Sequence, residues 1–251
     1  MDIRDALPAE DEAVAVFFHN CFLDTWNHNW HASAPVVPEP LLLPLPRTLT
    51  TAQSSRLLFY AALSQATRLC GGFIRIVFFT EDPSTIVGCA MWTGPQHRIL
   101  DGPFDILKSG FYKLMAPWRW GVRGYVRLDL QFESTVNKLA NAAFKKHDGG
   151  KHKARDSLYL QMIAVHASAR GRGLAGRLIE DGRAKVGEDV PVLLEATREK
   201  VAAVYKRSGF EVVGTELIAK GKVDEDGCTK QGKSRVAEGH PIIVMVDWRR
   251  S

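Results

Sequence analysis

The sequence predicts an α/β fold: a mixed central sheet of about six to seven strands flanked by helices, with a helical insertion between the third and fourth strands. From residue 158 onward, patterns typical of strand, helix, strand, helix and two further strands follow one another. Residues 73–93 hold two apolar runs around a turn, which predicts a hairpin. Residues 95–156 are less regular and predict mostly helix, which gives the insertion.

The composition fits one globular domain that spans residues 1–251. The chain is 45% hydrophobic and 24% charged with a formal net charge of +5, which supplies a core and mildly favours anionic ligands. The charge is modest and no stripe of aromatic and basic residues stands out, which argues against a nucleic-acid partner. The four cysteines form no C-x-x-C pair, so no metal site is predicted.

The chain carries no signal for secretion or membrane insertion. Its first residues lack a basic stretch followed by an apolar one. The most apolar run, residues 57–80, is interrupted by Gln65, Arg68 and Arg75 and is too polar to span a bilayer. We therefore expect a cytoplasmic protein without membrane contact, acting as a monomer or homodimer.

Each element follows from local patterns. A short strand at residues 3–4 precedes a helix at about 8–22, and five prolines in residues 33–47 predict loop or extended chain. A second helix is expected at about 51–69, before a glycine pair. The remaining predicted elements are strands at 158–165, 190–196, 210–218 and 241–248, helices at 171–186 and 198–208, a turn at 82–84, a basic loop at 145–153, and a polar loop at 220–239.

The most informative segment is residues 170–176, of sequence RGRGLAG, between a predicted strand and a predicted helix. Backbone N–H groups at a helix N-terminus have no intrahelical partner, and the helix macrodipole adds partial positive charge there. Glycines let the backbone approach an anion, and Arg170 and Arg172 add charge-assisted hydrogen bonds. The segment therefore predicts a pyrophosphate-binding site.

One interpretation of this loop is a dinucleotide-binding fingerprint. Gly171, Gly173 and Gly176 fit G-x-G-x-x-G, and Glu195 lies about 20 residues on, where that motif has an acid. Three features argue against it: five residues separate the strand from the glycines, too little chain precedes the motif for a doubly wound domain, and the later segments do not repeat a β-α-β order. An NAD(P)-binding oxidoreductase is for these reasons the less favoured interpretation, and it is kept only as an alternative.

The other interpretation is a resemblance. Residues 170–175 match the pattern Q/R-x-x-G-x-G/A of the GNAT superfamily of acyl-CoA N-acyltransferases, which wraps the pyrophosphate of coenzyme A. Residues 160–166 and 192–197 resemble the family's fourth and fifth strands, and YKRSGF at 205–210 resembles its Y-x-x-x-G-F helix end. The resemblance covers residues 157–215 well, as the cofactor-binding core, and implies the GNAT fold for the chain.

The resemblance also implies acetyl-CoA as co-substrate, with no metal. It assigns oxyanion and pantetheine contacts to backbone groups of the fourth strand and pyrophosphate contacts to the glycine-containing loop. One departure is Arg198, which stands where many members have an asparagine, seven residues before the tyrosine. The implied cofactor-binding residues are Ile163, Ala164, Val165, Arg170, Gly171, Arg172, Gly173, Leu174 and Ala175.

Two further segments resemble puromycin-acetyltransferase-like members of the superfamily. AMWTGP at residues 90–95 resembles their W-T-x-P segment, and LLEAT at 193–197 resembles their F-L-E-T-S segment. Within the superfamily, the chain is therefore expected to lie closest to these enzymes.

The implied reaction needs a base, oxyanion donors and an acid. An alkyl amine has a pKa near ~10.4 and must lose a proton before it attacks, and a leaving thiolate with a pKa near ~8.5 then takes one up. By the resemblance, Tyr205 is the acid near the thioester sulfur, although a helix tyrosine also simply packs on a sheet. Glu195 is the candidate base, because a carboxylate in an apolar strand is costly to bury without a role; the alternative is a salt bridge to an arginine.

Other side chains are weaker candidates. Gln161 lies near where some family members place a glutamate base, but an amide cannot take a proton. Trp92 is proposed to line the acceptor pocket, against the alternative of core packing. His166 and His147 are read as loop histidines, and the lysines at 145–153 as a solvated basic loop.

The predicted function is an N-acetyltransferase that moves an acetyl group from acetyl-CoA to an amine by direct attack in a ternary complex. No cysteine or serine stands in a nucleophile motif. The expected acceptor is a small-molecule amine such as a xenobiotic, antibiotic or metabolite. A protein lysine or N-terminal acetyltransferase and a non-catalytic CoA-binding pseudo-enzyme remain alternatives.

Overall fold

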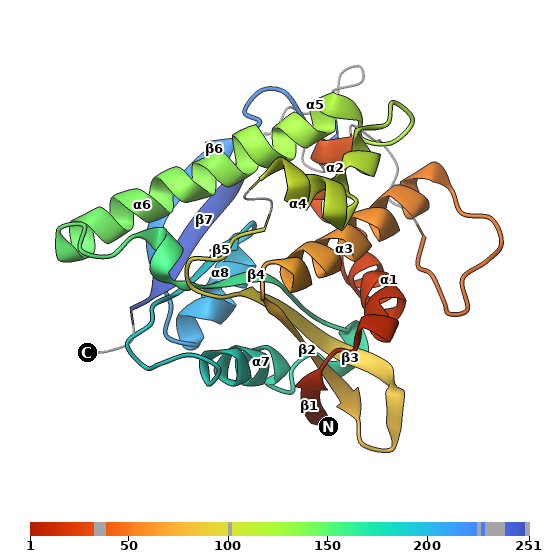
Figure 1. Cartoon of the computed structure of the whole chain (residues 1–251), viewed down its shortest axis with the longest axis horizontal. Helices are drawn as coiled ribbons and strands as arrows, with labels where there is room; N and C mark the ends of the chain where they lie inside the picture. The colour runs from red at the N-terminus through yellow and green to blue at the C-terminus, as the bar shows by residue number, and fades with distance from the viewer. Residues whose placement is uncertain (33–38, 100–101, 225–226, 229–238, 249–251) are drawn as a thin grey trace.

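The computed structural model contains a seven-stranded mixed sheet with helices on both faces (Figure 1). The strand order is β1-β2-β3-β4-β5-β7-β6. The structure describes the chain apart from residues 33–38, 100–101, 225–226, 229–238 and 249–251. The predicted loops at 33–47 and 220–239 therefore lie partly outside the described residues.

The first half of the sheet is antiparallel. Strand β1 (Asp2–Asp5) pairs with β2 (Phe73–Phe79), and β2 pairs with β3 (Asp82–Thr93). The predicted hairpin is thus present, but residues 82–84 belong to β3. The turn is shorter than predicted because Pro83 is accommodated at the start of the strand, where its missing N–H costs no ladder bond.

The second half contains the sheet's parallel pair. Strand β4 (Leu158–Val165) runs parallel to β5 (Val192–Ala196). The last strand, β7 (His240–Asp247), enters between β5 and β6 (Glu211–Ile218) and is antiparallel to both. The predicted parallel pair and antiparallel end are both confirmed.

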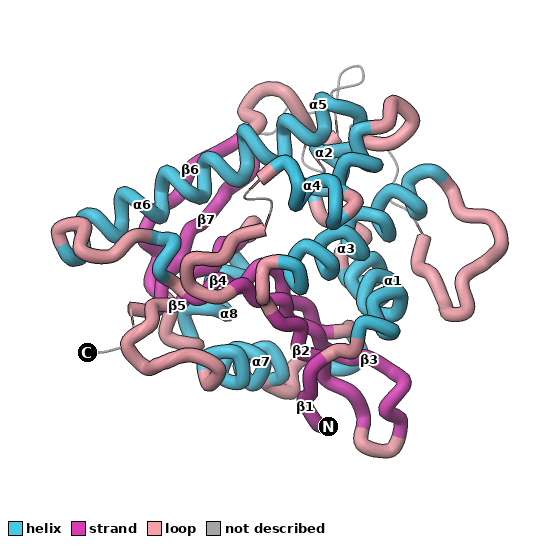
Figure 2. The backbone as a smooth tube through the Cα atoms, viewed as in Figure 1, coloured by secondary structure: helices cyan, strands magenta, loops and turns pink. Residues whose placement is uncertain are grey.

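Alternating side chains of the strands point to the two faces of the sheet and are buried on both. Figure 2 shows the helices that lie on either side of the strands. One face packs on α1 (Asp11–Cys21), α3 (Thr51–Leu69), α2 (Trp26–Ala32) and α6 (Ser134–Asp148). The other packs on α7 (Leu174–Arg183) and α8 (Glu199–Arg207). Sequence patterns did not predict α2, because its sequence WNHNWHA is rich in histidine and asparagine rather than in periodic aliphatic residues.

The chain between β3 and β4 is helical, which confirms the predicted insertion. It consists of α4 (Pro103–Ser109), a 3-10 turn (Phe111–Met115), α5 (Gly121–Val126), a π-helical segment (Arg127–Glu133) and α6. Helix α6 runs along β6 and β7 (Figure 1). Lys145, Lys146 and His147 lie in its last turn and not in a loop, and the His147 ring stacks on Trp248 with centroids 3.8 Å apart.

Helix α7 begins three residues later than predicted, at Leu174 rather than Gly171. Gly171 and Gly173 have φ angles of +77° and +72°, a left-handed conformation that keeps them outside the helix. Helix α8 ends before Gly209, whose φ of +89° closes it as predicted. Among the described residues, no helix is long and apolar enough to cross a bilayer.

The contact of α7 with the sheet gives a test of packing. A Cβ on Gly182 would overlap the Trp92 indole, whereas a Cβ on Gly176, in the same helix, would come no closer than 4.0 Å to Ser208 Oγ. We expect Gly182→Ala to lower the free energy of unfolding by about 2–3 kcal/mol through overpacking. The control Gly176→Ala should raise it by up to ~1 kcal/mol through helix propensity. Urea unfolding of both variants measures this, and equal effects would contradict the close packing on Trp92.

Candidate active site

The site begins where strands β4 and β5 part. Their parallel ladder joins only two residue pairs, ending at Tyr159 with Leu193, although both strands continue. On the other edge of β4, a register shift between Met91 and Trp92 of β3 leaves Gln161 without a partner on that strand. Such β-bulges bend a strand and are frequent beside active sites. The backbone of β4 beyond Tyr159 therefore faces an opening in the sheet rather than β5.

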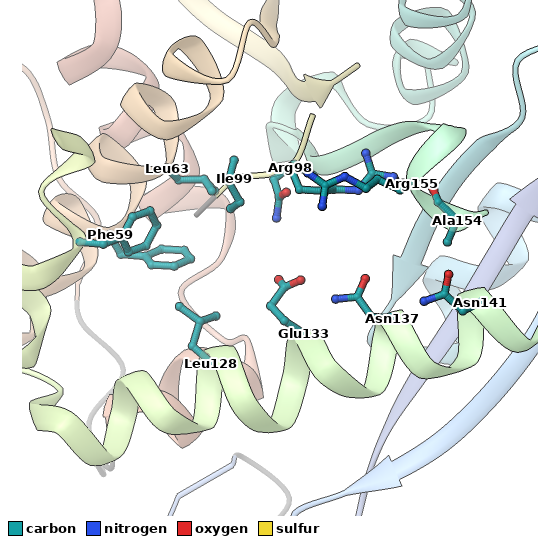
Figure 3. A pocket seen from close by; sticks show the side chains of 12 residues that line it. Phe59, Leu63, Arg98, Ile99, Leu128, Glu133, Asn137, Asn141, Ala154 and Arg155 are labelled. Carbon is teal, nitrogen blue, oxygen red and sulfur yellow. Dashed lines mark hydrogen bonds between the residues drawn. The ribbon is translucent and has the colours of Figure 1, made fainter. Parts of the chain in front are cut away.

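Two cavities meet at this opening. The larger cavity, of 480 Å³, lies between the parted strands and α8. The smaller cavity, of 350 Å³, lies between α6 and the side chains of Arg98 and Arg155 (Figure 3). Both volumes are in the range of small-molecule sites. The shared walls make the two cavities neighbouring chambers of one site. The residues common to both are Phe59, Leu63, Leu128, Glu133 and Gln161.

The predicted cofactor loop stands at the rim of the larger cavity. Gly171, Arg172 and Gly173 are exposed, and within the described residues none of their backbone N–H groups has a hydrogen-bond acceptor. Gly173 is the N-cap of α7, so the N–H groups in the first turn of this helix, which have no intrahelical acceptor, lie next to those of the loop. Arg170 lines the larger cavity and donates from Nε to the Val165 carbonyl at 3.3 Å. The loop therefore offers backbone donors and positive charge to an anion at the cavity mouth.

The structure places the other cofactor-binding candidates in two groups. Ile163, Ala164 and Val165 line the larger cavity along β4, and Ala175 lines it from the first turn of α7. Leu174 is buried in the core under α7 and contributes only its backbone to the helix start. The residues present thus fit a long anionic ligand with a pyrophosphate at the loop and a narrow tail along β4.

Glu195 holds a carboxyl group inside the larger cavity. Its Oε2 accepts a hydrogen bond from the Tyr159 hydroxyl at 2.6 Å, and among the described residues no salt bridge to an arginine is formed. Burial, and next the nearby Glu133 carboxylate, raise the pKa of Glu195 to about 8. A carboxyl group with a pKa near 8 is matched to proton exchange at neutral to mildly alkaline pH.

Arg98 holds the Tyr159 ring from the other side. Its guanidinium lies 5.0 Å from the ring centroid and donates to the carbonyls of Ala154 at 2.8 Å and His97 at 2.9 Å. The bond to Ala154 fixes the chain after β3 to the chain before β4. Arg98 thereby positions Tyr159, which in turn positions the Glu195 carboxyl.

Glu133 is a site residue that sequence reasoning missed. It ends the π-helical segment, lines both cavities, and its charge raises the pKa of Glu195 and of Tyr159. Figure 3 shows its side chain pointing from the helix into the smaller cavity. A single glutamate in an irregular insertion gives no local signal. Only the path of the insertion across the sheet brings it to Glu195, although a π-helical turn often marks a functional position.

Tyr205 lies in α8 and lines the larger cavity. Its side chain is mostly buried, and its ring packs against Phe210 with centroids 6.0 Å apart. Burial, and then the charge of Glu195, raise the pKa of the Tyr205 phenol above its usual range. The hydroxyl therefore stays protonated and is a hydrogen-bond donor at any physiological pH.

Helix α2 adds histidines that the sequence did not single out. His28 and His31 line the larger cavity, and His28 Nε2 is 2.5 Å from the Tyr60 hydroxyl. The Nδ1 atoms of both rings are buried without a hydrogen-bond partner. Burial lowers the pKa of His31 to about 3 and that of His28 well below its usual range, so both rings are neutral.

Trp92 does not lie where it was predicted. It is fully buried on the opposite face of the sheet, against α7, and lines neither cavity. Neighbouring strand residues point to opposite faces of the sheet, so Trp92 and Met91 lie on different faces, and both cavities lie on the face of Met91.

His166 has a structural role in the loop, as predicted. Its ring accepts a hydrogen bond from the backbone N–H of Ser168 at 3.3 Å and caps a 3-10 turn.

Arg198, which replaces the asparagine of many GNAT members, lies at the N-cap of α8. Its Nη2 donates to the Asp24 carbonyl at 2.5 Å, which connects α8 to the chain before α2.

The observed fold does not agree with the dinucleotide-binding interpretation of residues 171–176. Among the described strands only β4 and β5 are parallel, and Glu195 is engaged with Tyr159 inside the cavity.

Comparison with known proteins agrees with this fold. A family model described as an acetyltransferase (GNAT) domain matches residues 139–223. No curated protein matches the sequence significantly.

Solved structures resemble the chain over nearly its whole length. A protein of Corynebacterium glutamicum described as histone acetyltransferase HPA2 and related acetyltransferase superposes with a TM-score of 0.53 at 18% identity, covering 99% of this chain and 96% of its own. Drosophila melanogaster polyamine N-acetyltransferase gives 0.53 at 15% identity, covering 98% of both chains. Arylalkylamine N-acetyltransferase 2 of Aedes aegypti gives 0.53 at 16% identity, covering 98% and 97%.

The predicted fold class is therefore confirmed: the chain has the GNAT fold, and its residues 139–223 match the model of a GNAT acetyltransferase domain. The enzyme class predicted from the sequence, an acyltransferase, is confirmed with it. Closeness to puromycin-type enzymes stays a prediction, as do the domain limits at residues 95–156 and 157–215.

The raised pKa of Glu195 makes stability depend on pH. Between its unfolded pKa of 4.5 and its folded value of about 8, the native state binds more protons than the unfolded state. The free energy of unfolding therefore falls as pH rises through this window. We expect Glu195→Gln, whose amide still accepts from Tyr159, to remove this loss and to stabilise the protein at pH 9 by on the order of 2 kcal/mol relative to wild type, with little effect at pH 4.5. Urea unfolding at both pH values measures it, and an equal effect at both would mean that the Glu195 pKa is ordinary.

Proposed function

We propose that this protein transfers an acetyl group from acetyl-CoA to the amine of a small molecule by direct attack in a ternary complex. The observation that carries the proposal is the meeting of two cavities at Glu133 and Gln161, beside the parted ends of β4 and β5. The larger cavity is lined by Arg170 of the anion-binding loop, and the smaller cavity is lined by Asn137 and Asn141 of α6. Two substrates entering from these two chambers come together at the Glu195 carboxyl.

Binding of acetyl-CoA is supported by the donors that the loop presents. The pyrophosphate would lie against the N–H groups of Gly171 to Gly173 and the start of α7, with Arg170 and Arg172 as counter-charges. The pantetheine would run along β4, whose backbone beyond Tyr159 has no partner on β5. When bound, acetyl-CoA supplies the acetyl thioester.

Glu195 is the proposed base. It receives a proton from the incoming ammonium, directly or through water, because its pKa of about 8 lies closer to that of an amine than an ordinary carboxyl pKa does. The same value is close to the ~8.5 of a thiol, so Glu195 can return this proton to the leaving sulfur, while the second proton leaves the nitrogen of the tetrahedral intermediate to water. Backbone N–H groups of β4 beside the bulge would stabilise the oxyanion that develops on the carbonyl.

Tyr205 is the proposed donor to the leaving sulfur. With its pKa raised by burial, the phenol is too weak an acid to give its proton to a thiolate outright. It can stabilise the developing thiolate by a hydrogen bond. Cys21 also lines the larger cavity, but burial raises the pKa of its thiol to about 11, which supports a mechanism without a cysteine nucleophile.

The direct test combines binding and turnover. Calorimetric titration with acetyl-CoA should show micromolar binding, and thiol release should depend on an added amine. Arg172→Glu places a negative charge at the loop and should weaken binding by about 10–100-fold, or ~1.4–2.7 kcal/mol. Lys185→Glu makes the same charge change just after the C-terminal end of α7, away from the loop. This control variant should bind acetyl-CoA normally. Absence of acetyl-CoA binding by the wild-type protein would overturn the proposal.

The role of Tyr205 predicts a separate kinetic effect. We expect Tyr205→Phe to lower kcat by about 10–100-fold, because only the transition state carries charge on the sulfur. The KM for acetyl-CoA should change little, and Tyr112→Phe, at an exposed tyrosine of the insertion, should behave as wild type. An unchanged kcat would mean that Tyr205 only packs on the sheet and takes no part in the reaction.

A further inference from the structure

The β-bulge in β4 places Gln161 on the face of the sheet that carries both cavities. Trp92 of β3 pairs with Leu160, and Met91 pairs with Met162, so Gln161 is the extra residue of the bulge. Leu160 lies in the core under α7, whereas Met162 packs on the core formed with α1 and α3. Gln161 stands between them and lines both cavities. The bulge therefore adds a polar side chain at the point where the two cavities meet.

The register of the parallel strands places Gln161 opposite Glu195. Tyr159 pairs with Leu193, and the ladder ends there. Gln161 and Glu195 each follow two residues later, so they would face one another if the ladder continued. Both side chains line the larger cavity, which lies between the parted strands. A ligand atom in this gap therefore has an amide on one side and a carboxyl group on the other.

The side-chain oxygen of Gln161 lacks a donor within the described part of the chain. Its Oε1 is buried and accepts no hydrogen bond there, whereas the Glu195 carboxyl across the gap accepts one from Tyr159. An amide oxygen that is removed from water without a donor costs free energy, and such atoms are uncommon in folded proteins. The unpaired oxygen therefore indicates a donor that comes from a bound ligand.

The walls around Gln161 favour a ligand with an apolar body. Phe59, Leu63 and Leu128 line both cavities together with Gln161, and Phe132 lines the larger one. Apolar and aromatic walls bind a ligand by burial of apolar surface, and the few polar groups among them determine its orientation. A hydrogen bond to Gln161 would therefore fix the end of the ligand that carries the donor.

We propose that Gln161 positions the acceptor amine by accepting an N–H hydrogen bond at Oε1, opposite the Glu195 carboxyl. This inference rests on the proposed function and adds a residue that holds the acceptor. When an ammonium group enters the gap, one N–H donates to Gln161 and a second gives its proton to the Glu195 carboxylate. The nitrogen lone pair left by that proton is then free to attack the thioester carbon. Because an amide is neutral, Gln161 binds the nitrogen without favouring its charged form, as a carboxylate would.

Gln161→Met tests the unpaired oxygen in the ligand-free protein. Methionine fills a similar volume without an amide, so the variant removes the unsatisfied group without opening a cavity. We expect its melting temperature to rise by about 2–4 °C. Gln65→Met makes the same change at an exposed position of α3 outside both cavities, and should shift the melting temperature by about 1 °C or less. A lower melting temperature for Gln161→Met than for wild type would overturn the inference.

The same variant should bind the acceptor more weakly. The probe is 2-phenylethylamine, whose ring suits the apolar walls, and calorimetry uses protein saturated with coenzyme A. We expect Gln161→Met to weaken its binding by about 10-fold, or ~1.4 kcal/mol, and to leave the affinity for acetyl-CoA unchanged.

A ligand without N–H groups is the matched control. Trimethyl(2-phenylethyl)ammonium has the same ring and charge but no N–H, so its affinity should be equal in wild type and Gln161→Met. An equal loss for both ligands would mean that Gln161 only shapes the cavity. If neither 2-phenylethylamine nor butan-1-amine binds to the wild-type protein, Gln161 does not hold an amine.

Turnover separates this inference from the proposed function. With saturating acetyl-CoA, Gln161→Met should raise the KM for 2-phenylethylamine by about 10-fold, and the KM for acetyl-CoA should stay the same. Binding that depends on the N–H group, without acetyl transfer by the wild-type protein, would support the role of Gln161 and contradict the catalytic function. Acetyl transfer with the same amine KM in both proteins would support the function and overturn the role of Gln161.

Discussion

The early end of the β4–β5 ladder is the constraint on which the rest of the site depends. Because only two residue pairs join these strands, the remaining peptide groups of β4 lie open to a cavity instead of to a neighbouring strand. The bulge at Gln161 turns the strand at this point. Helices α2 and α8, the loop before α7 and the insertion then close the opening from different sides. A longer ladder would fill the space of the larger cavity with backbone.

Burial of Glu195 is the energetic cost of this arrangement. An unpaired carboxylate inside a cavity is unfavourable. Burial therefore raises the pKa of Glu195, which favours the neutral carboxyl group, and the Tyr159 hydroxyl donates a hydrogen bond to it. Arg98 holds Tyr159 in position, and Glu133 opposes ionisation of Glu195 from the α6 side. The carboxyl group that is proposed as the base thus lowers the stability of the fold at high pH, a compromise often found at functional sites.

Local chemistry made part of this site predictable. The loop at residues 170–175 could be found because glycines, arginines and a helix start stand next to one another in the sequence. The succession of strands and helices from residue 158 onward followed from hydrophobic patterns, but the place of β7 between β5 and β6 did not. Glu133 could not be found, because its position depends on how the insertion crosses the sheet. Trp92 was predicted to line the pocket, but neighbouring residues of a strand point to opposite faces of the sheet, and the sequence does not show which face carries the site. The bulge beside Trp92 makes this assignment harder still.

Amide hydrogen exchange with and without coenzyme A would test the central claim most directly, because it reports on the open strand and the loop together. The account predicts that peptides covering residues 161–165 and 171–176 become protected by coenzyme A, whereas the hairpin at residues 73–93 exchanges as before. Protection of the loop without protection of β4 would mean that the ligand does not enter between the parted strands. Protection confined to other parts of the chain would contradict the location of the site.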